Sequence, residues 1–194
     1  MCGIAGFLTK DSTAFDSYYV IKRMTEILSH RGPDGEGIEV FQSPKFGCVT
    51  AIGHRRLKII DLSEKARQPM FNEDKNLSIV FNGELYNYLE LKEELLAKGY
   101  KFFSSSDTEV ILNAYAEWGA GCFERFNGMW ALAIFDKNKG KVILSRDRFG
   151  KKPLYYYKTD TEFVFASEIK SILKYPGVIK KPNYDKIYRY IACN

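Results

Sequence analysis

The sequence predicts an α+β protein built as a layered sandwich, and two observations support this class. Segments with strand character occur in neighbouring pairs and helical segments stand in separate blocks, so the chain lacks the regular alternation of a parallel βαβ sheet. Aromatic residues make up 15% and hydrophobic residues 45% of the 194 residues, which suits packed sheets around a substantial core. This length fits one domain or two small ones.

The N-terminal half is predicted to contain several strands and one helix. Residues 3–8 form a short apolar run with two glycines, which is typical of a buried strand, and residues 15–29 have helical spacing. The segment RGPDGEG at 31–37 is rich in turn residues and predicts a loop. Further strands are expected at residues 46–53, 57–61 and 77–83.

Two helices are predicted in the middle of the chain from their capping signals. Asn87 and Glu90 have capping-box spacing at the start of a helix that ends with a basic last turn and Gly99. Ser106, with Glu109 three residues later, is a good N-cap for the next helix. The other expected elements are a hairpin of MWALAIFD and KVILSRD with a turn at 137–140, strands at 154–157 and 163–166, and helices at 167–174 and from 182 onward.

The charge and cysteine patterns argue against several classes of protein. The net charge is +5, but basic and acidic residues are interspersed, so the chain has no nucleic-acid footprint. The cysteines at positions 2, 48, 122 and 193 form no C-x-x-C pair or Cys/His cluster, which argues against a zinc site. The start of the chain has no basic leader, and no apolar run approaches the roughly 20 residues that span a bilayer. We therefore expect a cytoplasmic protein with reduced thiols and no membrane partner.

Cys2 is the first candidate for chemistry. If Met1 is removed, Cys2 carries both a thiol and a free α-amine, and an N-terminal amine can activate an adjacent nucleophile. An α-amine with a pKa of about 7.7 to 8.0 is roughly one tenth neutral at pH 7, far more than a lysine, so it suits the role of base. Taken alone, Cys2 also fits an ordinary small residue after the initiator methionine.

Six motifs occur in one order along the chain: MCGIAGF at 1–7, RGPDGEG at 31–37, GHRRLKIIDLS at 53–63, FNGELYN at 81–87, SSDTEVIL at 105–112 and SRDRFGKKPLYYY at 145–157. Together they resemble the glutaminase domain of the glutamine-hydrolysing asparagine synthetase family, a class II glutamine amidotransferase, from Cys2 to about Tyr175. Amidotransferases that make glucosamine phosphate or phosphoribosylamine are similar at Cys2 but match RGPDG and RLKIIDLS less closely. The resemblance implies a four-layer αββα sandwich of two antiparallel sheets between helices, of the Ntn-hydrolase type. It also implies hydrolysis of glutamine to glutamate and ammonia.

The FNGE segment offers donors for the oxyanion that forms during amide hydrolysis. Loss of one fixed donor aimed at that charge can cost roughly 100-fold in rate. The Asn82 carboxamide and the Gly83 N–H, at the end of a predicted strand, can supply two such donors. An Asn-Gly pair is also a common turn. By resemblance, Asn82 and Gly83 form the oxyanion hole, and Glu84 helps to hold the substrate.

Glutamine has an α-carboxylate and an α-ammonium group, so its pocket needs a cation and an anion. Arg56 suits the carboxylate because its planar guanidinium can bind it bidentately. The resemblance gives Arg56 this role and places the main chain near Ile60 in the same pocket. Asp107 corresponds to the aspartate that receives the ammonium group, although an acidic residue in a first helical turn is also favourable for the helix dipole. Arg55 departs from many relatives and is interpreted as a surface charge.

The remaining polar motifs give weaker indications of chemistry. His30 and His54 are the two histidines of the chain, and neither lies in a Cys-His protease signature. The RDRFG segment is interpreted as a turn between core strands, with Arg146 and Asp147 as an internal ion pair. The sequence contains neither a G-x-x-x-x-G-K-[ST] phosphate loop nor an S-G-G-x-D-S pyrophosphatase loop, so no cofactor is expected to bind this chain.

We therefore expect a glutaminase domain over residues 2–175 and the start of a linker, residues 176–194, toward a synthetase domain outside this sequence. By resemblance, that domain would use ATP and magnesium, and the ammonia would amidate an aspartyl-type acceptor. Two alternatives stay open: a different acceptor such as a sugar carboxylate, and a catalytically silent domain kept for regulation or partner binding. A homodimer is compatible with the sequence.

Overall fold

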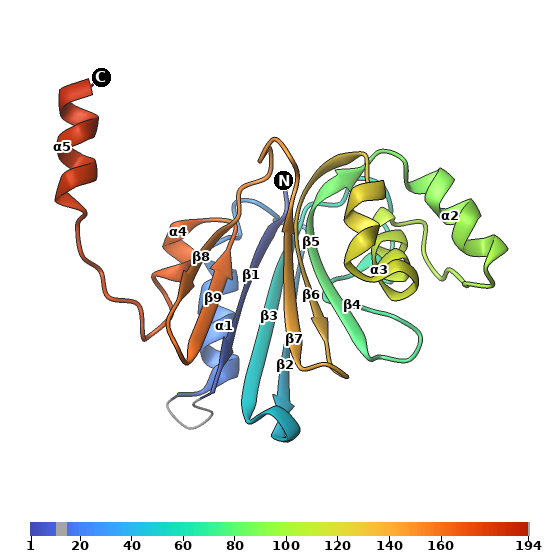
Figure 1. Cartoon of the computed structure of the whole chain (residues 1–194), viewed down its shortest axis with the longest axis horizontal. Helices are drawn as coiled ribbons and strands as arrows, with labels where there is room; N and C mark the ends of the chain where they lie inside the picture. The colour runs from blue at the N-terminus through green and yellow to red at the C-terminus, as the bar shows by residue number, and fades with distance from the viewer. Residues whose placement is uncertain (11–14, 194) are drawn as a thin grey trace.

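Segments rich in β-branched and aromatic residues pair into two antiparallel sheets in the computed structural model, which describes residues 1–10 and 15–193. The two sheets pack against each other, and helices cover their outer faces (Figure 1). This arrangement is the αββα sandwich of the α+β class that the sequence and the resemblance predicted.

The first sheet has five strands in the order β2-β3-β1-β9-β8, and its neighbouring strands are antiparallel. The N-terminal strand therefore lies in the middle of this sheet. Helices α1 and α4 cover the outer face (Figure 1). The elements of this half are β1 (Gly3–Thr9), α1 (Ser17–Glu26), β2 (Gly35–Ser43), β3 (Cys48–Arg56), β8 (Tyr155–Lys158), β9 (Glu162–Ala166) and α4 (Ile169–Ile172), with a 3-10 turn at Pro44–Phe46.

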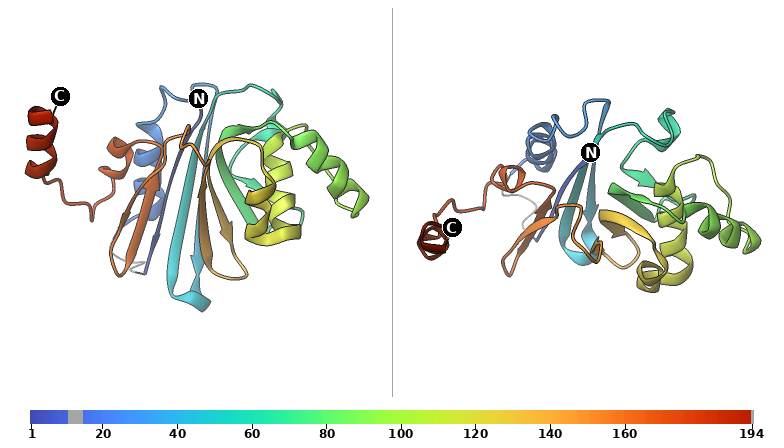
Figure 2. Two further views of the ribbon diagram at one scale, coloured as in Figure 1. Left: turned by 45° about the horizontal axis from the view of Figure 1, so that its top comes forward. Right: turned by 90° about the horizontal axis from the view of Figure 1, so that it is seen from above.

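The second sheet has four strands in the order β4-β5-β6-β7, again with antiparallel neighbours. Helix α3 packs on its outer face and α2 packs against α3, as two further views show (Figure 2). The elements of this half are β4 (Met70–Phe71), β5 (Leu77–Leu85), α2 (Tyr88–Ala97), α3 (Asp107–Trp118), β6 (Gly128–Asp136) and β7 (Lys141–Arg146), with 3-10 turns at Glu64–Ala66 and Gly119–Arg125.

The core has one apolar cluster under each helical layer and a third cluster between the sheets. Successive residues of a strand face opposite sides, so each strand contributes to two of these clusters. Even-numbered residues of β1, β3 and β5 face the layer between the sheets, as Ile4, Ile52 and Val80 demonstrate. This alternation decides which polar side chains near the strand ends can meet.

Helix α5 (Tyr184–Cys193) lies apart from the sandwich at the end of an extended segment (Figure 1). None of its residues is buried. It confirms the helix predicted from residue 182 onward. Among the described residues, no helix has both the length and the apolar character needed to cross a membrane.

The predicted strand at residues 57–61 was wrong. The Lys58 N–H donates to the Asp34 carboxylate at 2.9 Å, and Ile59 and Ile60 are 55% and 40% exposed. The hydrogen bond to Asp34 holds the segment as an irregular loop, and its apolar residues do not join a sheet.

The predicted loop at residues 31–37 is shorter than expected, because β2 already begins at Gly35. A Cβ on Gly37 would lie 1.9 Å from the Gln68 carbonyl oxygen, so glycine lets β2 pack directly on that main chain. Because the first residues of β2 are also typical turn residues, the sequence pattern did not predict where this strand begins. The rest of β2 and the short β4 were not predicted.

Both predicted capping boxes were wrong in detail. The Asn87 side chain makes no cap bond and instead links the Arg125 carbonyl and the Asn127 N–H, at 3.0 and 2.9 Å. Ser106 does cap α3, because its hydroxyl accepts from Thr108 N. Its expected partner Glu109, however, accepts main-chain N–H bonds from the two residues 103 and 104. The side chains of Asn87 and Glu109 therefore bond to main-chain groups outside their own helices.

Candidate active site

One end of the layer between the sheets gathers the predicted polar residues. Arg56 is the last residue of β3, and Asn82 and Glu84 lie near the end of β5, all on the inward-facing side of their strands. Cys2 directly precedes β1, and the pairing of Gly3 with Arg55 brings Cys2 beside the end of β3. The fold thus brings together segments that lie far apart in the sequence.

A small pocket of about 50 Å³ opens at this end of the sandwich. Its walls come from the N-terminus, the loop after β3, the end of β5 and the start of α3. Six of the seven predicted site residues line it, namely Cys2, Arg56, Ile60, Gly83, Glu84 and Asp107. The seventh, Asn82, is not a lining residue and is 1% exposed within the same stretch of β5.

The Cys2 thiol is held by the main chain of Leu57. The Leu57 N–H donates to Sγ at 3.4 Å, and the thiol donates to the Leu57 carbonyl at 3.7 Å. Burial raises the pKa of Cys2, while the Leu57 N–H, the positive N-terminus and Arg56 act in the opposite direction. Because burial dominates, the thiol needs a nearby base to form the thiolate.

The main chain of Cys2 is fixed by a residue that sequence reasoning missed. Arg31 Nε donates to the Cys2 carbonyl at 2.9 Å, and its Nη1 pairs with Glu168 at 3.0 Å. Ser167 exchanges two hydrogen bonds with Ile4, of 2.8 and 3.0 Å, and so fixes the start of β1. The RGPDG motif contains Arg31, but its partners come from the other end of the chain and gave no local signal.

The open edge of β5 directs main-chain N–H groups toward the pocket. The Phe81 N–H donates to Gln68 Oε1 at 2.6 Å, and the Leu85 N–H donates to Asp107 Oδ2 at 3.0 Å. Alternate N–H groups of a strand point the same way, so the Gly83 N–H, which lies between these two, faces the same edge. A Cβ on Gly83 would lie 2.2 Å from the Met129 carbonyl oxygen, which only glycine avoids.

The Asn82 carboxamide carries an unused donor. Its Nδ2 is buried and has no hydrogen-bond partner among the residues that the structure describes. An unpaired buried donor typically costs about 1–3 kcal/mol, so it calls for an explanation. An anion that forms beside β5 during a reaction would supply the missing acceptor.

Arg56 is buried beneath the loop that follows it. Its Nη1 donates to the Ser63 carbonyl at 2.8 Å and its Nη2 donates to the Asp61 carbonyl. These bonds use only part of the donor capacity of a guanidinium, which leaves N–H groups for a carboxylate. The neighbouring Arg55, interpreted as a surface charge, is partly exposed and pairs with Glu36 across β2 and β3 at 2.5 Å.

Asp107 begins α3 and is only 5% exposed. Burial raises its pKa to about 6, although N–H groups of Leu85 and Thr108 stabilise the charged form, and the charge of Glu84 raises the pKa further. A buried carboxylate in this state gains from a cation that binds next to it.

Neither histidine is placed to activate the thiol. Burial lowers the pKa of His54 to about 3, so its ring is neutral. Its Nε2 lies 3.1 Å from the Phe81 carbonyl oxygen, which can only accept, so this nitrogen carries the proton. His30 lies on the surface and contacts Glu168 at 2.9 Å. The described contacts of the Cys2 thiol are with Leu57, so a Cys-His pair is not formed.

The RDRFG segment forms a turn, as predicted, but the expected ion pair within it is wrong. Asp147 accepts N–H bonds from main-chain groups, among them those of Lys152 at 3.1 Å and Trp130 at 3.2 Å. Arg146 instead donates to the Lys152 and Gly150 carbonyls at 2.7 and 2.6 Å. The carboxylate organises the turn and the guanidinium closes it, and both stay apart from the pocket.

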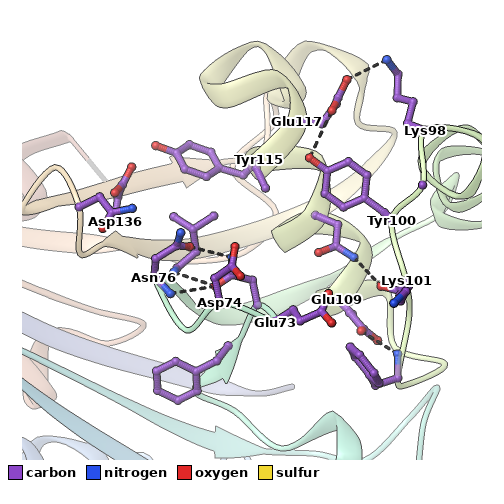
Figure 3. Close-up of a pocket in the computed structure, with 18 of the residues that line it drawn as sticks. Glu73, Asp74, Asn76, Lys98, Tyr100, Lys101, Glu109, Tyr115, Glu117 and Asp136 are labelled. Carbon is purple, nitrogen blue, oxygen red and sulfur yellow. Dashed lines mark hydrogen bonds and ion pairs between the residues drawn. The ribbon is translucent and has the colours of Figure 1, made fainter.

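A larger hollow of about 690 Å³ lies on the helix side of the second sheet, beside α3 (Figure 3). Two ion pairs lie among its charged side chains. Glu117 pairs with Lys98 at 2.7 Å and accepts from the Tyr100 hydroxyl at 3.2 Å, and Asp136 pairs with Lys139 at 3.1 Å. None of the predicted site residues lines it.

The sandwich, with a cysteine at the start of the central strand of one sheet, is the Ntn-type fold of class II glutamine amidotransferases. The chain belongs to the glutamine amidotransferase domain family, whose model matches residues 1–194. Its fold is similar to that of glutamine phosphoribosylpyrophosphate amidotransferase from B. subtilis, with a TM-score of 0.70 and 25% identity over 88% of this chain and 42% of that one. A structure described as the allosteric regulatory enzyme of purine biosynthesis shares the fold, with a TM-score of 0.71 and 24% identity over 89% of this chain and 43% of that one.

Closer sequence relatives are asparagine synthetases. The chain is 44% identical over 200 residues to the putative glutamine-hydrolysing asparagine synthetase 2 of Methanocaldococcus jannaschii, covering 96% of this chain and 38% of the relative. It is 39% identical over 180 residues to glutamine-hydrolysing asparagine synthetase 3 of Bacillus subtilis, covering 92% of this chain and 28% of the relative. The chain therefore spans well under half the length of these relatives.

Proposed function

We propose that this chain hydrolyses L-glutamine to glutamate and ammonia, with Cys2 as the nucleophile after removal of Met1. The observation that carries the proposal is one pocket lined by a thiol, a buried guanidinium and a buried carboxylate. These three groups match the amide, the α-carboxylate and the α-ammonium group of glutamine. The family to which the chain belongs supports the same reaction.

Substrate binding uses opposite charges at the two sides of the α-carbon. Arg56 donates to the α-carboxylate, and Asp107 accepts from the α-ammonium group, with Glu84 beside it. The main chain at Ile60 forms the wall next to Arg56. A pocket of about 50 Å³ is smaller than a glutamine molecule, so the pocket must widen when substrate enters.

The reaction begins with proton transfer from the Cys2 thiol to the freed α-amine of the same residue. The thiolate attacks the amide carbon, and the Asn82 Nδ2 and the Gly83 N–H donate to the oxyanion that forms. The α-amine then returns the proton to the departing nitrogen, which leaves as ammonia. Water hydrolyses the glutamyl thioester, which releases glutamate and restores the thiol.

The fate of the ammonia is proposed from the relatives. Asparagine synthetases at 39% and 44% identity suggest transfer to an aspartyl-type acceptor by a further synthetase domain. In that arrangement residues 2–175 form the glutaminase domain, residues 176–194 begin the linker, and ATP and magnesium bind only to the synthetase domain. A cytoplasmic location fits these partners.

The test is to incubate L-glutamine with the chain after removal of Met1 and to measure the glutamate and ammonia that are released. Equal amounts of both products are expected, and a Cys2→Ala variant should produce neither above background. A folded, processed chain that releases no glutamate would favour the catalytically silent alternative.

A further inference from the structure

One buried side chain connects the two ends of the proposed substrate pocket. Gln68 is 6% exposed and lies in the pocket wall. Its Oε1 accepts from the Phe81 N–H at 2.6 Å, and its Nε2 donates to the Thr108 hydroxyl at 3.1 Å. Phe81 directly precedes Asn82, and Thr108 directly follows Asp107. Gln68 therefore joins the strand of the oxyanion donors to the helical turn that carries the buried carboxylate.

The edge of β5 needs such a partner because its neighbouring strand is short. Strand β6 lies on one side of Phe81, but β4 pairs only with residues 78 and 79, so no strand lies beside Phe81 on the β4 side. The Gln68 side chain accepts a hydrogen bond from the Phe81 N–H. His54, which belongs to the other sheet, donates to the Phe81 carbonyl at 3.1 Å. Without these side chains, two buried main-chain groups would lack partners.

The main chain of Gln68 packs closely against β2. Its main-chain carbonyl packs so closely on Gly37 that a Cβ there would lie 1.9 Å away. The side chain is thus fixed at its base by β2 and at its tip by both β5 and α3. Such a three-way link transmits a change in any of these elements to the others.

We propose that Gln68 is a positioning residue that, together with the direct hydrogen bond from the Leu85 N–H to Asp107, sets the separation between Asp107 and the oxyanion donors of β5. It touches no reacting atom, and it acts through Thr108 and Phe81. The role rests on the proposed function and adds substrate selection to it. The side-chain amide of glutamine reaches the Cys2 thiol in the correct position only when the α-ammonium group of the same molecule is bound to Asp107. Gln68 helps to set the distance between these two points.

The experiment removes one half of the link and compares two substrates. Thr108→Val deletes the hydroxyl that Gln68 Nε2 binds, and Thr108→Ser retains it. The substrates are L-glutamine and glutaramate, which has the same amide and carboxylate but no α-ammonium group. The measured quantity is the ratio of kcat/KM for L-glutamine to kcat/KM for glutaramate, with thermal unfolding as a check on folding.

Thr108→Val should lower this ratio about tenfold, because the unpaired Gln68 amide releases the spacing between β5 and Asp107. Thr108→Ser should keep a ratio close to that of the wild type. Thr108→Ala removes the same hydroxyl without added bulk and serves if the valine variant does not fold.

An unchanged ratio in Thr108→Val, or an equal fall in Thr108→Ser, would overturn the role of Gln68 while glutaminase activity of the wild type stands. A processed wild type that fails to turn over L-glutamine would overturn the proposed function, and this inference with it.

Discussion

The main chain of Leu57 engages the Cys2 thiol in both directions, since its N–H donates to Sγ at 3.4 Å and its carbonyl accepts from the thiol at 3.7 Å. These contacts place the thiol at the rim of the pocket, next to the strand that ends in Arg56. They also keep it in a buried site where its pKa is raised. The proposed nucleophile therefore lies beside the pocket and, with its raised pKa, needs a base to become reactive.

This placement predicts selective protection of Cys2 by ligand. Iodoacetamide should modify both Cys2 and the exposed Cys193, and L-glutamate in the pocket should slow only the reaction at Cys2. Peptide mass spectrometry after timed alkylation measures both sites in one sample, so Cys193 is an internal control. Equal slowing at both cysteines, or none at Cys2, would show that the amino acid does not bind beside the thiol.

Arg56→Ala should weaken glutamine binding and raise KM about tenfold or more, because a charge-assisted hydrogen bond to the α-carboxylate is worth about 1.5–3 kcal/mol. Arg56→Lys should recover only part of this loss, since an ammonium group cannot form the bidentate contact. Lys65→Ala, a nearby exposed residue, is the matched control. Steady-state kinetics decide the matter, and an unaltered KM in Arg56→Ala would remove this arginine from the pocket.

Asp107 gives a prediction for stability against pH. Its pKa rises from the ordinary 3.8 to about 6 on folding, so the folded state holds this proton more tightly than the unfolded state. Stability from this group is present below about pH 4 and is lost as the pH rises through about 6. Asp107→Asn keeps an acceptor for the Leu85 N–H and removes the charge.

The Asp107→Asn variant should be up to about 3 kcal/mol more stable than the wild type at pH 7 and nearly equal at pH 4. Urea unfolding at the two pH values measures the difference. A variant that is less stable at pH 7 would contradict the buried, destabilising carboxylate. L-glutamine affinity of the wild type should also fall as the pH drops below about 6, where Asp107 becomes neutral.

Gly83→Ala should destabilise the second sheet by about 1–3 kcal/mol, because the added Cβ would meet the Met129 carbonyl oxygen at 2.2 Å and force β5 and β6 apart. Gly121→Ala is the matched control, since a Cβ there meets no atom within 4 Å. Denaturant midpoints of the two variants provide the comparison. Identical midpoints would mean that β5 and β6 tolerate a side chain at this position.

The sequence predicted the sandwich and most strands because long apolar runs and hairpin signals are local features. The Asn82-Gly83 pair illustrates the limit of such signals. As a dipeptide it is typical of a turn, yet both residues lie inside β5, where Gly83 is required by the close approach of β6. The strand predicted at residues 77–83 already included both residues, and the structure extends it to Leu85. Their role as oxyanion donors, which the resemblance suggested, stays a prediction.

The parts that could not be predicted depend on contacts between distant segments. The apolar residues of 57–61 suggested a strand, but the Leu57 main chain bonds to Cys2 and the Lys58 N–H to Asp34. Gln68 carried no motif at all, and its two partners lie 13 and 40 residues away. Only the assembled fold brings these distant partners together at the pocket.

In the proposed mechanism one residue, Cys2, supplies both the attacking thiol and the proton acceptor. Two preparations of the same chain test it most directly, one with Met1 removed and one with Met1 retained, each verified by intact mass. Glutamate release is expected only from the processed chain, because a peptide bond to Met1 abolishes the basicity of the Cys2 nitrogen. Equal turnover by the chain that retains Met1 would contradict it.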